Sequence, residues 1–349
     1  MRAIVVERPG GVDRLKLMEV PDPSPQPGDV VIEVVYAGCN WSDIQKRQGV
    51  YPDPVEYPVI LGLEVSGRVV AKGRGLRSYA VGDRVAAITG LRMLGGYAER
   101  IAVSSEYLIA LPERIGLDTG AAFPVVALTA YHLLHSAYSL RRGETVLVHS
   151  ISGAVGLMVT QMAKAAGAKV IGTVGSPGKS ARAREFGADL VIEREKEDFV
   201  EAALAFTRGK GVDLVIDSLG GDILPRSFDA LRTYGHVINI GEAAGYPNFP
   251  IRPKLYERST SLAGFEVLHA RPGSARWRRG VRYVVDGIVS GHLRVPIEGV
   301  YPLERCADMH RRLEERTVSG KLLLAVGGGS ADRAPVSPSR LRGGMARSV

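Results

Sequence analysis

The sequence predicts an α/β protein in which a doubly wound parallel sheet is inserted into a β domain. Residues 1 to about 122 are short strand patterns divided by Gly and Pro, which is typical of an antiparallel β domain. From 124 to 265, strand and helix patterns alternate, which favours a parallel sheet with right-handed crossovers. The sixty or so ordered residues that follow are too few for a third domain, so we expect them to complete the β domain.

Each element follows from local periodicity and from turn residues at its ends. Strands are expected at 1–6, 30–36, 65–71, 83–88, 145–149, 169–174, 189–192, 212–217, 235–240 and 321–326, and helices at 154–166, 274–290 and 303–316. The predicted division is a catalytic β domain at 1–123, a nucleotide-binding domain at 124–265 and a completion of the β domain at 266–326. Residues 327–349 are rich in Gly, Pro, Ser and Arg and are expected to be a disordered tail.

Composition excludes several classes of protein. No run of 18 or more apolar residues appears and the chain starts directly with an amphipathic strand, so we expect no membrane partner, no secretory signal and a cytoplasmic location. Cys39 and Cys306 are too few for a disulfide framework. The net charge of +8 includes several tail arginines, and the local cluster from Arg271 to Arg282 lacks a nucleic-acid-binding module, so a solvated surface is favoured and no nucleic-acid partner is expected.

A small-residue turn separates the strand at 145–149 from the helix at 154–166. Its spacing is Ser150-x-x-Gly153-x-x-Gly156, with Ser150 at an outer glycine position and Ala154 after the central glycine. Unpaired backbone N–H groups at a helix start attract phosphate, and small residues let the phosphate approach. The strand, turn and helix together predict a dinucleotide site. The cofactor-binding residues expected here are Ser150, Ser152, Gly153, Ala154, Val155 and Gly156.

The next strand indicates which dinucleotide binds. NAD-binding sheets carry a carboxylate at the end of this strand, but residues 169–179 contain no Asp or Glu. Gly175, Ser176 and Lys179 instead offer space, a hydroxyl and a cation for a 2′-phosphate. The sequence therefore predicts NADPH; the alternative for Lys179 is a solvated residue in the first turn of the next helix.

Several ordered motifs resemble the medium-chain dehydrogenase/reductase superfamily, in its quinone oxidoreductase (ζ-crystallin-like) branch. The resemblance covers residues 1–326 and implies a GroES-like β domain split around a Rossmann domain, and a homodimer. Besides the glycine turn, the motifs are Ala37-Gly-Cys-Asn-Trp-Ser-Asp43, Gln48-Gly-Val-Tyr-Pro52, Leu61-Gly-Leu-Glu-Val-Ser-Gly67, Val81-Gly-Asp-Arg-Val85, Gly95-Gly-Tyr-Ala-Glu99 and Gly211-Val-Asp-Leu-Val-Ile-Asp-Ser-Leu-Gly-Gly221.

The resemblance also indicates that no metal is bound. Asn40 and Leu63 look to stand where zinc-dependent members have a metal-binding Cys and His, and the four-cysteine structural-zinc lobe is missing. Catalytic zinc needs about three N, S or carboxylate ligands, and Glu64 alone cannot supply them. His132 and His135 have ligand-like spacing, but a helix-face or core role is favoured for this pair. A site without a Lewis acid suits acceptors that already take hydride readily, such as quinones and α,β-unsaturated carbonyls.

Asn40 and Tyr51 are the catalytic candidates, because they match family positions near the nicotinamide. We expect Tyr51 to donate a hydrogen bond or a proton to the reduced acceptor; the alternatives are a packing role for Tyr51 and a turn or cap role for Asn40. Asp43 and Glu64 are expected to bond local backbone groups. Thr129, which resembles a family position near the cofactor, and Gly241 are expected to contact NADPH; a helix-interior hydroxyl is the alternative for Thr129.

Three functions are compatible with these residues. The leading one is NADPH-dependent reduction of a small quinone or other conjugated carbonyl in the cleft between the domains. The second is reduction of 2-enoyl thioesters of coenzyme A or a carrier protein, for which the arginines from Arg271 to Arg282 could line a basic entrance. The third is a non-enzymatic protein that binds a dinucleotide or nucleic acid.

Overall fold

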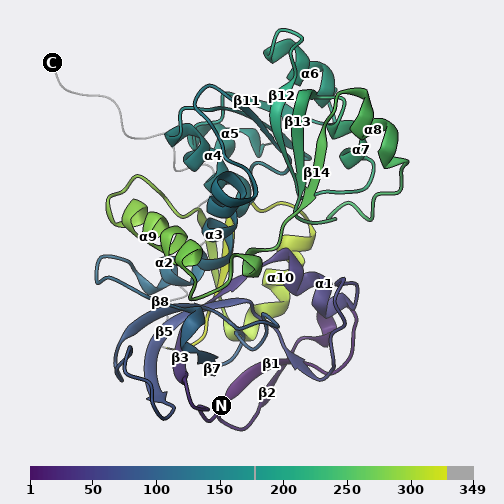
Figure 1. Cartoon of the computed structure of the whole chain (residues 1–349). Coiled ribbons are helices and arrows are strands. Elements are labelled where there is room, and N and C mark those ends of the chain that lie inside the picture. Colours follow the sequence, from purple (N-terminus) through teal and green to yellow (C-terminus); the bar gives the residue numbers. More distant parts are fainter. Residues whose placement is uncertain (177, 328–349) are drawn as a thin grey trace, which may run out of the picture.

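The chain forms one mainly antiparallel sheet system and one parallel sheet, which lie at opposite ends of the molecule (Figure 1). The computed structural model describes residues 1–176 and 178–327. The expected α/β class, with a GroES-like domain and a Rossmann sheet, is confirmed. The prediction of a disordered tail falls, beyond Gly327, outside the described residues.

The antiparallel part contains a seven-stranded sheet in the order β15-β16-β3-β5-β6-β8, with β7 also paired to β3, and a three-stranded sheet in the order β2-β1-β4. β16 pairs antiparallel with β3, so the last described strand returns to the N-terminal sheet. The strands are β1 (Arg2–Val6), β2 (Lys16–Glu19), β3 (Asp29–Cys39), β4 (Val59–Ile60), β5 (Glu64–Lys72), β6 (Arg84–Ile88), β7 (Arg100–Ser104), β8 (Leu108–Ala110), β15 (Ile297–Pro302) and β16 (Lys321–Ala325).

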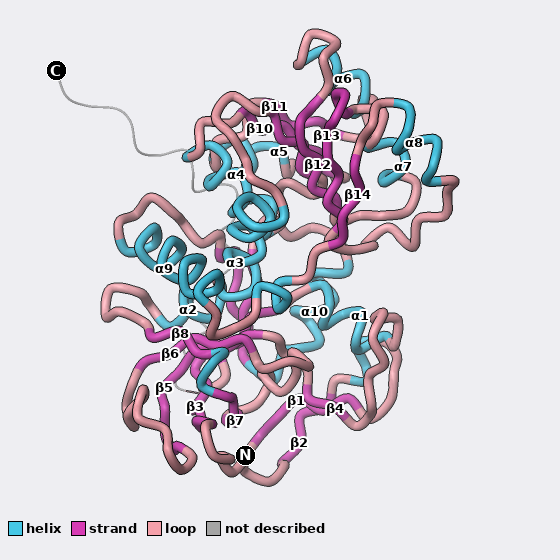
Figure 2. The backbone as a smooth tube through the Cα atoms, in the orientation of Figure 1, coloured by secondary structure: helices cyan, strands magenta, loops and turns pink. Residues whose placement is uncertain are grey.

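The parallel sheet has six strands in the order β11-β10-β9-β12-β13-β14, all paired in parallel (Figure 2). They are β9 (Thr145–Val148), β10 (Lys169–Val174), β11 (Leu190–Glu193), β12 (Val212–Asp217), β13 (Leu231–Asn239) and β14 (Ser261–Gly264). Side chains alternate along the central strand: Val146 and Val148 pack into one core and Leu147 into another. Helices therefore cover both faces of this sheet, as expected for a doubly wound fold.

The first face packs against Leu157 of α4 and the second against Phe199 of α6. The helices are α1 (Trp41–Gln48), α2 (Leu117–Ala122), α3 (Pro124–His132), α4 (Ala154–Ala165), α5 (Ser180–Glu185), α6 (Phe199–Phe206), α7 (Ile223–Ser227), α8 (Ile251–Glu257), α9 (Ala275–Val289) and α10 (Cys306–Glu314). Among the described residues, none of these helices has the length and apolar character that a membrane span requires.

Several elements differ from the sequence prediction: the strands β2, β4, β7, β8, β14 and β15 and the helices α1, α2 and α3 are not among the predicted elements. The edge strand β14 is absent from the predicted elements, because its four residues are mostly exposed and show no apolar alternation. The helix expected at 303–316 begins with a short 3₁₀ turn and becomes α-helical only at Cys306. The division between the domains at residue 265 stays a prediction; α9 lies beyond it, and its Trp277 packs in the same core as Leu157.

Candidate active site

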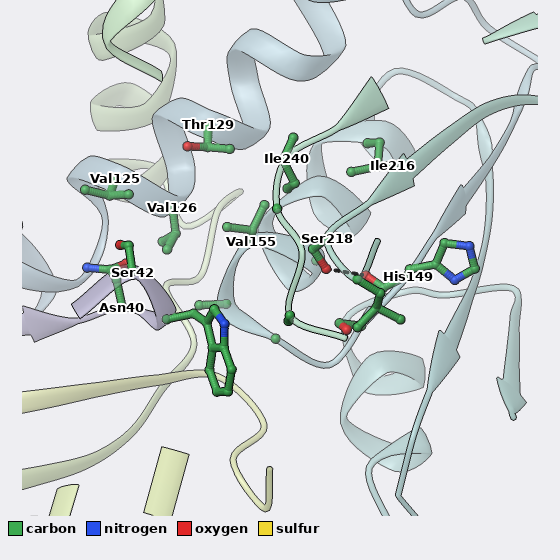
Figure 3. A pocket seen from close by; sticks show the side chains of 18 of the residues that line it. Asn40, Ser42, Val125, Val126, Thr129, His149, Val155, Ile216, Ser218 and Ile240 are labelled. Carbon is green, nitrogen blue, oxygen red and sulfur yellow. Dashed lines mark hydrogen bonds between the residues drawn. The ribbon is translucent and has the colours of Figure 1, made fainter. Parts of the chain in front are cut away.

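A cavity of about 900 Å³ lies between the two sheet systems. Figure 3 shows part of its wall, where Asn40 and Ser42 face side chains carried by α3, α4 and the ends of the parallel strands. All thirteen residues that the sequence singled out line this one cavity: Asn40, Tyr51, Thr129, Ser150, Ser152, Gly153, Ala154, Val155, Gly156, Gly175, Ser176, Lys179 and Gly241. The structure therefore brings together groups that are separated by up to two hundred residues in the sequence.

The turn after β9 adopts the geometry that a phosphate site needs. Ser150 has a φ of 54°, in the left-handed region that glycine usually fills. Gly153 is the N-cap of α4, so the first backbone N–H groups of that helix have no partner within it, and the residues from Gly153 to Gly156 line the cavity. A Cβ on Gly156 would lie 2.6 Å from the carbonyl oxygen of Ile151, so this glycine allows the helix to pack on the turn.

His149 precedes the turn but is not a catalytic candidate. Its Nδ1 lies 2.9 Å from Oγ1 of Thr173 and its Nε2 lies 3.0 Å from Oγ of Ser227. The ring points away from Val155, while the backbone oxygen accepts a hydrogen bond from Ser218 (Figure 3). Complete burial lowers the pKa of His149 to about 3, so the ring is neutral at physiological pH.

One end of the cavity carries three cationic side chains. Lys179 Nζ donates to the backbone oxygen of Arg316, Arg316 Nη2 donates to the oxygen of Ala243 at 2.9 Å, and Arg194 Nη1 donates to Oγ1 of Thr173 at 2.8 Å. All of these acceptors are neutral. Burial lowers the pKa of both Lys179 and Arg194, and the positive charge of Arg316 lowers both further. This end of the cavity is therefore suited to a bound anion.

The other end is built around the Asn40 amide. Asn40 follows β3 and is the N-cap of α1. It also lines the cavity, so a capping role does not exclude a role in the site. Its Nδ2 donates to Glu64 Oε1 at 3.0 Å, and its Oδ1 accepts from Lys321 Nζ at 2.6 Å. Glu64 Oε2 also accepts from the backbone N–H of Val125 at 2.7 Å. The expectation that Glu64 bonds only local backbone is wrong, because its partners come from distant segments.

Tyr51 is half-buried on the same wall. Lys46 Nζ lies 4.7 Å from the centre of its ring and donates to the backbone oxygens of Arg92 and Met93, each at 3.0 Å. Burial, and then the negative charge of Asp53, raise the pKa of the Tyr51 phenol. The hydroxyl is thus protonated at physiological pH and is available as a hydrogen-bond donor.

Buried polar groups also join the two loops that follow β12 and β13. Asp217 accepts from the backbone N–H of Leu219 at 2.9 Å and from Asn239 Nδ2 at 3.1 Å. Asn239 Nδ2 also donates to the oxygen of Gly241 at 3.0 Å. These bonds fix the Gly241 segment at the cavity wall.

Five charged residues that line the cavity are missing from the sequence predictions: Arg194, Glu242, Glu266, Arg316 and Lys321. Arg194 follows β11 directly, at the carboxyl edge of the parallel sheet where ligands bind, so its sequence position could have identified it as a cavity residue. Arg316 and Lys321 reach the cavity from the C-terminal return of the chain, which local patterns do not locate. Within residues 1–176 and 178–327, no group of three or more His, Cys, Asp or Glu side chains is arranged to hold a metal ion.

Known proteins resemble this chain over nearly its whole length. Residues 26–113 match the alcohol dehydrogenase GroES-like domain, and residues 154–285 match the family described as zinc-binding dehydrogenase. The chain is 32% identical over 330 residues to 2-haloacrylate reductase of a Burkholderia species, covering 92% of this chain and 98% of that protein. It is 33% identical over 323 residues to quinone oxidoreductase 1 of Escherichia coli (strain K12), covering 90% and 96%. The crystal structure of Escherichia coli quinone oxidoreductase complexed with NADPH aligns with a TM-score of 0.89 at 31% identity, covering 93% and 100%.

The neutral state of His149 predicts a pH dependence of stability. Its pKa lies below the ordinary value of 6.5, so between pH 6.5 and about 3 the unfolded chain binds a proton that the folded protein does not. The free energy of unfolding should therefore fall as the pH falls through this range. In His149→Gln this fall should be shallower by about 1.4 kcal/mol per pH unit between pH 6 and 4, as measured by urea denaturation.

His269 supplies the matched control, because its side chain is 84% exposed. His269→Gln should keep the wild-type pH dependence. Equal slopes in the wild type and His149→Gln would contradict the assignment of a neutral, buried His149.

Proposed function

The chain belongs to the medium-chain dehydrogenase/reductase superfamily, in its quinone oxidoreductase branch, and from this premise we propose that it is an NADPH-dependent, zinc-independent reductase of quinones or related α,β-unsaturated carbonyls. The observation that carries the proposal is the division of the cavity into a cationic end and a hydrogen-bonding end around Asn40 and Tyr51, where the Lys321 ammonium is paired with the Glu64 carboxylate. A phosphorylated cofactor and a neutral acceptor match these two ends. The homodimer that the resemblance implies remains an expectation.

The residues present fit NADPH. The N-terminus of α4 and the turn from Ser150 to Gly156 are suited to the pyrophosphate. A Cβ on Gly175 would lie 2.8 Å from Arg194 Nη2, so glycine leaves room beside the guanidinium. We assign Lys179, Arg194 and Arg316 to the 2′-phosphate, because these three positive charges gather at one end of the cavity and the groups that accept their hydrogen bonds are neutral. Reduced nicotinamide, when bound, supplies a hydride equivalent.

The acceptor end offers two uncharged donors. We infer that the Tyr51 hydroxyl, kept protonated by burial, donates to the acceptor oxygen. The Asn40 amide would supply a second hydrogen bond, and together these donors stabilise negative charge that spreads over a conjugated acceptor. Apolar side chains of the cavity wall, which include Leu63, Met93, Val125, Phe265 and Val267, would limit the access of water to a bound acceptor.

The thioester alternative receives less support from the arrangement of charges. None of the arginines at 271, 276, 278, 279 and 282 lines the cavity, although all five are at least partly exposed. Glu266 lines the cavity instead and lowers the attraction for a polyanionic carrier. We therefore place a neutral quinone or enone ahead of an enoyl thioester as the acceptor.

Replacing Lys179 should separate the two nicotinamide cofactors. Lys179→Ala removes a charge-assisted contact to the 2′-phosphate, so the dissociation constant of NADPH should rise about ten- to a hundredfold while that of NADH stays unchanged. Isothermal titration with each nucleotide measures both constants. Lys196→Ala is the matched control: this lysine is 66% exposed, pairs with Glu193 and does not line the cavity. Equal weakening of NADPH and NADH would remove the 2′-phosphate assignment.

Replacing Tyr51 should impair turnover with little effect on cofactor binding. In Tyr51→Phe the ring stays and the proton donor is lost, so kcat with a simple enone should fall about a hundredfold. The loss with 1,4-benzoquinone should be smaller, because its reduced form is less basic than an enolate. Steady-state oxidation of NADPH with both acceptors and with a crotonyl thioester gives the comparison.

Two results would count against these roles at the acceptor end. An unchanged kcat for Tyr51→Phe with the enone would remove the donor role. A wild-type kcat/KM for the thioester well above that for the quinone and the enone would make thioester reduction the better function.

A further inference from the structure

Lys321 is a buried cation at the acceptor end of the cavity. It is the first residue of β16, its side chain is 2% exposed, and it lines the cavity wall. Its Nζ lies 2.5 Å from Oε1 of Glu64, whose side chain is fully buried in β5. The same Nζ donates to Asn40 Oδ1 at 2.6 Å. This ammonium therefore bonds at once to a counter-ion and to a candidate catalytic amide.

The chemistry of the two charged groups permits only one orientation of the Asn40 amide. An ammonium group can only donate hydrogen bonds, and a carboxylate can only accept them. The Asn40 oxygen must therefore face Lys321 and the NH₂ group must face Glu64. A flipped amide would place N–H groups against the ammonium and its oxygen against the carboxylate, so both contacts would become repulsive.

We propose that Lys321 and Glu64 are positioning residues that lock the Asn40 amide so that it presents an N–H group, not its oxygen, to the acceptor. The inference rests on the proposed function and goes beyond it. The Asn40 NH₂ group has two hydrogens, and Glu64 takes one of them. The second remains for a molecule in the cavity that Asn40 lines. Neither charged residue needs to touch the acceptor to act in this way.

The pair also has a structural role that the test must separate. Glu64 accepts from the Val125 N–H in the first turn of α3, and so joins β5, β16 and α3. Removing one charge alone would leave the other buried and unpaired, which is strongly destabilising. Glu64→Gln/Lys321→Met removes both charges and keeps an acceptor for Val125. The new side-chain amide at position 64 can bond either face of the Asn40 amide, so the orientation is no longer fixed.

A double-mutant cycle with Asn40→Ala tests the proposal. With saturating NADPH and an enone, Glu64→Gln/Lys321→Met should lower kcat about tenfold with KM changed less than about twofold, because a misoriented group impairs turnover more than binding. In the Asn40→Ala background the same replacement should change kcat less than about twofold. A tenfold loss in both backgrounds, or no loss in either, would overturn the positioning role.

Two further variants keep the test decisive. If that double replacement does not fold, Glu64→Gln/Lys321→Gln, which also removes both charges, carries the same cycle. Arg47→Met/Glu314→Gln removes another ion pair, in which Arg47 is buried and Glu314 is partly exposed, with 2.6 Å between Arg47 Nη2 and Glu314 Oε1, and should lower the melting temperature without changing kcat. A wild type that reduces none of the acceptors would overturn the proposed function itself, whereas an active wild type with additive losses would overturn only the positioning role.

Discussion

The buried carboxylate of Glu64 is the contact on which the arrangement of the site depends. Transferring an ionised carboxylate from water into a protein interior costs several kcal/mol unless its partners are well placed. Here the partners are the Lys321 ammonium, the Asn40 amide and the Val125 N–H, which belong to β16, the start of α1 and the start of α3. Satisfying this one charge therefore fixes the C-terminal strand, the first helix and the helix that leads into the parallel sheet relative to one another.

The remaining charges are distributed in a way that supports the proposed reaction. Cations gather where we propose that a 2′-phosphate binds, and burial lowers the pKa of Lys179 and Arg194 although Glu298 and Asp217 act in the opposite direction. At the acceptor end, the charges of Glu64 and Lys321 compensate each other, and Asn40 and Tyr51 supply neutral donors to the cavity. His149, close to the phosphate turn, is held neutral because burial lowers its pKa, and it adds no charge. A doubly anionic phosphate would thus meet positive charges, and a neutral conjugated acceptor would meet neutral hydrogen-bond donors.

Much of this organisation follows from local sequence, and the rest depends on contacts between distant segments. The strand, turn and helix around Ser150 to Gly156 were predictable because apolar periodicity and small residues occur in adjacent positions. Strand β14 was not, because its short exposed edge sequence lacks periodicity. The partnership of Lys321 with Asn40 spans 281 positions, and that of Lys179 with Arg316 spans 137, so no window of sequence reveals either. Residue types alone indicated a dinucleotide site and an acceptor site. The bonds of Glu64 to Lys321, Asn40 and Val125 became visible only in the folded structure.

The most direct test of the proposed reaction follows the hydride itself. NADPH carrying deuterium at either C4 position of the nicotinamide is incubated with the wild-type protein and a simple enone, and the product is analysed by mass spectrometry and NMR. We expect one of the two labelled cofactors to transfer deuterium to the β-carbon of the product, with the α-hydrogen coming from solvent. An unlabelled product from both cofactors, or no reduction of the enone, would contradict direct hydride transfer to a conjugated carbonyl in this cavity.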